Sequence, residues 1–295
     1  MPFDPSGKAV VSTVGGPDRG VAPDLKLPYT TEYTAGLDQQ LMPDLSLRLE
    51  FVRKLDYHFY QQYNIAIPFS AYNIPFPGVD PGPDGITGNA DDRALSLFSL
   101  DPAYVGKNKG LYQNNPGVEA NYSTIEASVV KRFSNKYQFL TGWDYVHRST
   151  SGGVPQDPNA LLYRNAQRYW TWTYKVVGTY EAPYQVNLSA VFRASKGEPY
   201  GRRVNSPRLN QGVITLVAEP TGTYFNDTVR LLDFRAEKTF LVNERWGKVS
   251  AIFDLFNIFN SDAITAVSDL TGSQFRTVSQ TLTPRIFRLG ARFEF

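Results

Sequence analysis

The stretch Pro284-Arg-Ile-Phe-Arg-Leu-Gly-Ala-Arg-Phe-Glu-Phe295 is the part of the sequence that decides the predicted fold. From Phe287 onward every second residue is apolar, and Arg288, Gly290, Arg292 and Glu294 fill the alternate places. A period of two indicates a β-strand with one apolar and one polar face. A strand that closes on Phe293 and Phe295 is typical of outer-membrane barrels, although a soluble antiparallel sheet can show the same alternation.

The composition favours strands over helices. The chain has 295 residues, of which 14% are aromatic and 2 are methionine. Its net charge of +2 comes from basic and acidic residues in mixed order, which excludes the clustered basic face of a nucleic-acid-binding protein. There is no cysteine, so disulfides and thiolate metal sites are excluded. The first residues lack the apolar run of a secretory signal, so we expect either a cytoplasmic protein or part of a longer one.

Alternation predicts nine main strands, joined in turn by short turns and by loops of about 20 to 65 residues. The predicted strands cover residues 29–41, 45–54, 122–133, 137–148, 168–180, 184–195, 228–240, 248–259 and 287–295, with short segments at 94–100 and 213–218. Residues 1–28 are predicted to be a loop that leads into the sheet. Unequal connections are characteristic of barrels with short periplasmic turns and long outer loops. Nine is odd, so we expect these strands to be part of a larger barrel.

Three segments strengthen this interpretation through a family resemblance. They are residues 232–240 (LDFRAEKTF), 254–260 (DLFNIFN) and 284–290 (PRIFRLG), followed by the terminal Phe295. Together they resemble the C-terminal strands of TonB-dependent outer-membrane receptors, most closely the Oar-like subgroup with a carboxypeptidase-regulatory-like domain. The resemblance covers residues 29–295.

The resemblance implies an all-β fold, namely an antiparallel transmembrane β-barrel of 22 strands, of which these nine would be the last. It implies a bacterial outer-membrane location and, in the complete protein, a plug domain, TonB and the barrel assembly machinery as partners. Phe293 and Phe295 would form the C-terminal assembly signal. The sequence shows no signal peptide, plug or TonB box, so we expect no transport by this chain alone.

The loop over residues 80–92 is a candidate calcium site. Carboxylates separated by glycines can surround a calcium ion, although the spacing departs from the usual calcium-loop pattern. A solvated acidic turn is the alternative. The candidate ligands are Asp80, Asp84, Asp91 and Asp92.

Polar-face residues of the strands should point into the barrel if the apolar face meets lipid, because charge on the lipid side is costly. They are expected to form ion-pair ladders and plug contacts. The predicted residues are Glu32, Arg48, Glu50, Glu126, Asp144, Arg193, Asp233, Arg235, Glu237, Asp254, Arg288, Arg292 and Glu294.

Aromatic residues near the predicted strand ends are expected at the membrane interface, with sugar stacking as the alternative. They are Trp143, Tyr145, Trp170, Trp172 and Tyr184.

The sequence offers no set of catalytic residues, since it has two histidines, no cysteine and none of the usual hydrolase motifs. We therefore expect no enzyme. Two hypotheses remain: a portion of a TonB-dependent receptor whose ligand could be a siderophore, oligosaccharide or peptide, and a secreted β-sandwich that binds carbohydrate.

Overall fold

The computed structural model describes residues 18–161, 167–243 and 247–295. Its main element is one antiparallel sheet of nine strands in the order β2-β3-β8-β9-β10-β11-β16-β17-β20. The strands are β2 (Tyr29–Met42), β3 (Leu45–Tyr57), β8 (Ala120–Ser134), β9 (Tyr137–Thr150), β10 (Gln167–Ala182), β11 (Val186–Ser195), β16 (Val229–Asn243), β17 (Gly247–Phe256) and β20 (Ile286–Glu294). The prediction of nine alternating strands is confirmed.

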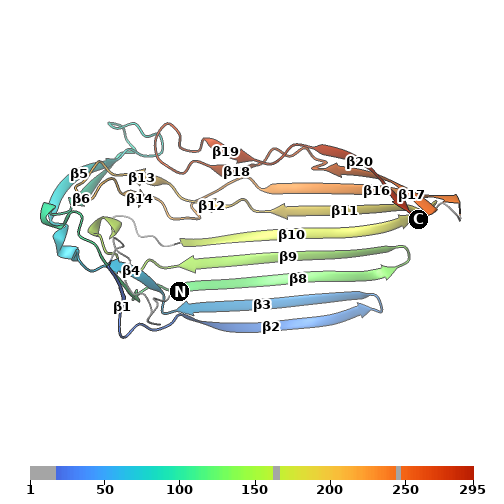
Figure 1. Ribbon diagram of the computed structural model, residues 1–295, viewed down its shortest axis with the longest axis horizontal. Coiled ribbons are helices and arrows are strands. Elements are labelled where there is room, and N and C mark those ends of the chain that lie inside the picture. Colours follow the sequence, from blue (N-terminus) through green and yellow to red (C-terminus); the bar gives the residue numbers. More distant parts are fainter. Residues whose placement is uncertain (1–17, 162–166, 244–246) are drawn as a thin grey trace, which may run out of the picture.

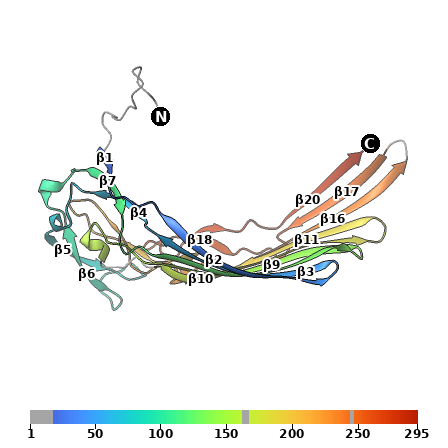
Figure 2. The ribbon, with the colours of Figure 1, turned by 90° about the horizontal axis from the view of Figure 1, so that it is seen from below.

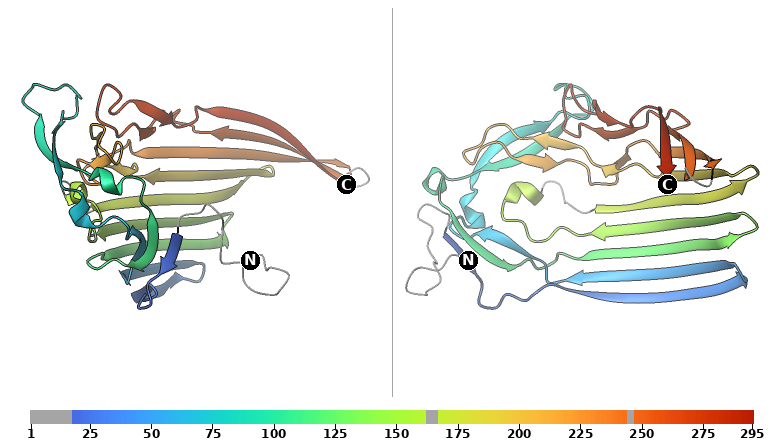
Figure 3. Two further views of the ribbon diagram at one scale, coloured as in Figure 1. Left: turned by 60° about the vertical axis from the view of Figure 1, so that its left-hand side comes forward. Right: turned by 45° about the vertical axis from the view of Figure 1, so that its right-hand side comes forward.

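Short turns join the strands at one end of the sheet, and long connections gather at the other (Figures 1 and 3). Asn135 and Lys136 both have positive φ, as the tight turn between β8 and β9 requires. Tyr184 and Gln185 also have positive φ, so they belong to the turn after β10, not to the following strand as predicted. Strand β17 ends at Phe256, earlier than predicted, because Asn257 has positive φ and its amide donates to Thr283 and Ser261 carbonyls.

The described residues hold eleven further short strands, β1 before the sheet and ten in the long connections, and the sequence did not predict most of them. They are β1 (Asp18–Val21), β4 (Tyr60–Asn64), β5 (Ile74–Asp80), β6 (Arg93–Ser99), β7 (Lys109–Asn114), β12 (Pro199–Tyr200), β13 (Arg203–Asn205), β14 (Thr215–Val217), β15 (Tyr224–Phe225), β18 (Ile264–Val267) and β19 (Val278–Thr281). Three 3-10 turns accompany them: η1 (Phe69–Ala71), η2 (Pro102–Tyr104) and η3 (Pro158–Leu161). Strands β6 and β14 correspond to the two predicted short segments.

The prediction that residues 1–28 form a loop is wrong for β1, which pairs in parallel with β7. Residues 1–17 lie outside the described residues. None of the helices in the described ranges is long and apolar enough to cross a membrane.

The nine strands form a single curved layer (Figure 2). A sandwich would need a second sheet packed against it. Strands β2 and β20 lie at its two edges, and each pairs with one neighbour within the described residues. Because every pairing in this sheet is antiparallel and the strand number is odd, the two edge strands run in the same direction.

Candidate functional site

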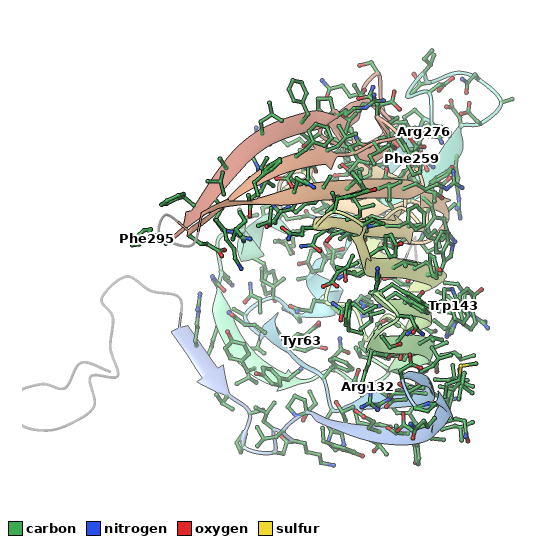
Figure 4. The ribbon with its side chains drawn as sticks, turned by 90° about the vertical axis from the view of Figure 1, so that its right-hand side faces the viewer. Tyr63, Arg132, Trp143, Phe259, Arg276 and Phe295 are labelled. Atoms are coloured by element: carbon green, nitrogen blue, oxygen red, sulfur yellow. The ribbon has the colours of Figure 1, made fainter. Side chains whose placement is uncertain are left out.

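The register divides the side chains of the sheet between two faces, since residues paired across strands point the same way. Figure 4 shows Trp143 on the convex side of the sheet. Its partners Ala127 and Tyr174 share that side, and the alternation extends the assignment along each strand. Large apolar side chains are exposed on the convex face, for example Leu289, which is 74% exposed.

All of the charged residues that the sequence analysis predicted to point into the barrel lie on the concave face. At the β20 end they form an ion-pair ladder. Asp254 is buried and lies between Arg235, at 2.6 Å, and Arg288, at 2.7 Å. Arg292 continues the ladder by pairing with Glu237 and, at 2.9 Å, with Glu294.

At the β3 end of the concave face, three carboxylates occupy one row across neighbouring strands. Glu50 pairs in register with Glu126, and Glu126 with Asp144. Arg48 donates to Glu50 at 2.8 Å, whereas Glu126 and Asp144 form no ion pair within the described part of the chain. Together with Lys175 they line an open hollow of about 260 Å³. Charges left unpaired in a spanning sheet mark a wet lumen or a contact with another polar segment.

The long connections form a second region, which we call the outer-loop layer: residues 58–119, 151–161, 196–228 and 257–285. It has a hydrophobic core drawn from two of these connections. Leu95, Leu97, Val204 and Leu216 are buried there, with Phe76, Ile214 and Ala218 packed against them. The layer is therefore packed and not a set of independent loops.

Arg202 joins three connections of the outer-loop layer. Its two terminal nitrogens donate to the two carboxylate oxygens of Asp80 at 2.6 and 2.8 Å, and one of them also donates to Thr271 at 2.8 Å. Both partners of the ion pair are buried, with side chains 7% and 3% exposed. A bidentate pair in such surroundings fixes geometry strongly, because neither charge can be rehydrated without opening the layer.

Side-chain amides also hold strand β6 to its surroundings. Asn159, which is fully buried, accepts from the Phe98 amide at 2.7 Å and donates to the Phe98 carbonyl at 2.9 Å. Gln211 accepts from the Leu100 amide at 2.8 Å. Asp157 in turn accepts from Asn159, and burial raises the pKa of the Asp157 carboxyl.

The calcium prediction is wrong for Asp80, because its carboxylate is engaged by Arg202. Asp84 and Asp92 accept from backbone amides of their own turn, those of Ile86 and Gly88. Across the described ranges, no three His, Asp or Glu side chains converge as a metal site would require, and Asp91 joins no such set.

The predicted interface aromatics occupy three positions. Trp143 and Tyr145 lie near the middle of β9, not near its end as expected, whereas Trp170 and Trp172 lie in the first half of β10. Tyr184 lies in the following turn and is 86% exposed. The rings of Tyr145 and Trp170 stack at 4.8 Å. Phe293 lies near the end of edge strand β20, and Phe295 directly follows that strand (Phe295 is labelled in Figure 4). Their ring centroids are 5.9 Å apart.

A curved antiparallel sheet that is apolar outside and charged inside, with short turns at one end and long loops at the other, is part of an outer-membrane β-barrel. Comparison with known families agrees: residues 2–197 match the outer membrane beta barrel domain, and the chain belongs to that family. The protein is located in the bacterial outer membrane.

A solved structure extends the likeness over nearly the whole chain. It is the outer-membrane transporter YddB from Escherichia coli, with a TM-score of 0.51 and 12% sequence identity, covering 96% of this chain and 35% of that one. The chain thus spans about a third of the transporter, and at this identity the likeness concerns the fold. No curated protein sequence matches the chain.

Proposed function

We propose that these strands form the C-terminal part of a TonB-dependent outer-membrane receptor that imports a ligand. The observation that carries the proposal is the open sheet, whose two edge strands run in the same direction and have no partner on their outer side among the described residues. A bilayer cannot hydrate free backbone groups, so a spanning sheet must close. Closing nine antiparallel strands into an all-antiparallel barrel takes an odd number of further strands, and the thirteen strands before these in a 22-stranded receptor would satisfy that condition.

The two regions of the site support the proposal in different ways. The charged concave face, with Glu126 and Asp144 unpaired by other described residues, suits contact with a plug inside the lumen. The outer-loop layer lies where an external ligand would arrive, and its packing gives a fixed surface for recognition. The Oar-like subgroup is part of the proposal and rests on the three sequence segments alone. No residue is assigned a catalytic role.

The test is to isolate the native protein from outer membranes and determine its intact mass and its partners. We expect a mass well above the 33.1 kDa of this chain, with additional N-terminal peptides of a plug. We also expect a formaldehyde crosslink to TonB that disappears when the N-terminal TonB-contacting segment is deleted. A native barrel that gives no crosslink to TonB would overturn the receptor proposal while leaving the barrel fold intact.

A further inference from the structure

The convex face of the nine strands carries basic residues and no acidic ones among its described side chains. Every Asp and Glu of these strands lies on the concave face by the register. The convex face holds Arg53, Lys131, Arg168, Arg230 and Lys238. This face meets lipid, so those of its cations that have no acidic partner among the described residues favour an anion of the membrane.

Two of these arginines, Arg53 on β3 and Arg168 on β10, lie three strands apart on either side of His147. Arg53 pairs with Ser123, which pairs with His147, so Arg53 and His147 lie in one row two strands apart, about 10 Å between backbones. Arg168 is paired with Ser149, two residues beyond His147. Arg168 and Arg53 are both near enough to His147 for their charges to interact with its ring. The side chain between Arg53 and His147 in that row is the small Ser123.

Among the described residues, Arg53 and Arg168 have no acidic partner of the kind that neutralises Lys131. Lys131 pairs with Asp44 at 2.6 Å in the turn between β2 and β3. Arg53 and Arg168 are exposed and form no ion pair with any residue that the structure describes. Two uncompensated cations on either side of His147 repel each other, and an anion between them removes that repulsion.

The height of this pair along the strands places it at a membrane surface. A strand crosses the bilayer in about 9 to 11 residues. Arg53 is the ninth residue of β3, counted from Leu45 after the turn, and Arg168 lies in the row of Leu55, the eleventh residue of β3. The pair therefore lies where the strands leave the hydrocarbon on the side of the long loops, which face outward.

An aromatic surface lies beside the arginines on the membrane side. The rings of Trp143 and Tyr145 stack at 5.9 Å, those of Tyr145 and Trp170 at 4.8 Å, and His147 contacts Trp170 at 4.3 Å. Flat, apolar rings below a cationic pair suit a molecule with an acyl chain and an anionic head.

We propose that Arg53 and Arg168 bind the phosphate of an outer-leaflet lipid, whose acyl chain lies along the surface formed by Trp143, Tyr145 and Trp170. A guanidinium group binds phosphate through parallel hydrogen bonds, so two of them can hold one phosphate from both sides. The site depends on the outer-membrane location and not on the proposed transport.

The test uses the full-length protein in detergent and native mass spectrometry. The probe is a diphosphorylated, acylated glucosamine disaccharide, compared with its dephosphorylated form. A basic residue at an anionic membrane surface changes affinity about fivefold, so Arg53→Gln with Arg168→Gln should weaken binding roughly 25-fold. The dephosphorylated lipid should bind the wild type about as weakly as the phosphorylated lipid binds that double variant.

The matched control is Arg148→Gln, which removes the same charge from the concave face of β9, a strand that lies between those of Arg53 and Arg168. It should leave binding unchanged, and the charge-conserving Arg53→Lys with Arg168→Lys should retain most of it. Equal loss in Arg148→Gln and in the double variant would overturn the site. So would equal binding of both lipid forms, or displacement of the lipid by inorganic phosphate at the same concentration, which would indicate a free anion as the ligand.

Discussion

The sheet and the outer-loop layer are stabilised in opposite ways. The sheet has long backbone ladders, and its apolar side chains face outward, as Phe287 does at 70% exposure. The outer-loop layer has short strands but holds a buried cluster around Leu97 and the buried pair of Arg202 with Asp80. The sheet relies on lipid to cover its apolar face, whereas the loop layer supplies its own core, as a soluble domain does.

This difference predicts which of the two regions a substitution destabilises more. In the sheet a lost side chain is replaced by lipid or water, and the backbone hydrogen bonds remain. In the loop layer the same loss leaves a cavity or an unpaired charge in protein. Local opening of the layer can therefore be measured separately from unfolding of the barrel.

The largest effect is expected for Arg202→Met in the full-length protein. It removes the cation that pairs with the buried Asp80 carboxylate, and breaking a buried pair costs about 3 to 5 kcal/mol. Hydrogen exchange should show faster exchange of the amides of β13 and β14, while those of β16 and β17 keep their protection.

The control for this prediction is Asp254→Asn in the sheet. Its partners Arg235 and Arg288 are 44% and 61% exposed, so they can be rehydrated and the loss should be far smaller. Equal destabilisation of the two regions by their respective substitutions would contradict the contrast.

A smaller effect is expected for Leu97→Ala, since Leu97 is fully buried in the loop core. A cavity of this kind costs about 2 to 5 kcal/mol. Limited proteolysis should cleave the outer-loop layer faster in this variant. Leu289→Ala on the convex face should change neither proteolysis nor barrel unfolding appreciably, because lipid fills the space. A slow, unchanged cleavage of Leu97→Ala would show that the cluster does not hold the layer together.

The sequence predicts the sheet well and the loop layer poorly, for a physical reason. A half-buried strand leaves a period of two in the sequence, visible from Tyr29 to the terminal Phe295. The loop layer depends on pairs far apart in the chain, such as Asp80 and Arg202, separated by 122 residues. Nothing near Asp80 reveals that partner, so its carboxylate was interpreted as a calcium ligand. The alternation also predicted which side chains share a face of the sheet. It could not predict that Glu50, Glu126 and Asp144 form one row, because that depends on the register between neighbouring strands.

The smallest effect is a pH dependence confined to the loop layer. Burial raises the pKa of Asp157 above its ordinary value of 3.8, so the folded layer holds this proton more tightly than the unfolded one. The stability of the layer should therefore fall as the pH rises from about that ordinary value through the raised one. Hydrogen exchange of the Phe98 amide, which donates to Asn159, measures this loss of stability once the rate is corrected for the pH dependence of intrinsic exchange. Asp157→Asn keeps an oxygen that can accept from Asn159 and should abolish the dependence of the layer's stability on pH. The same pH dependence in that variant would mean that another group is responsible. No pH dependence in the wild type would mean that Asp157 is solvated.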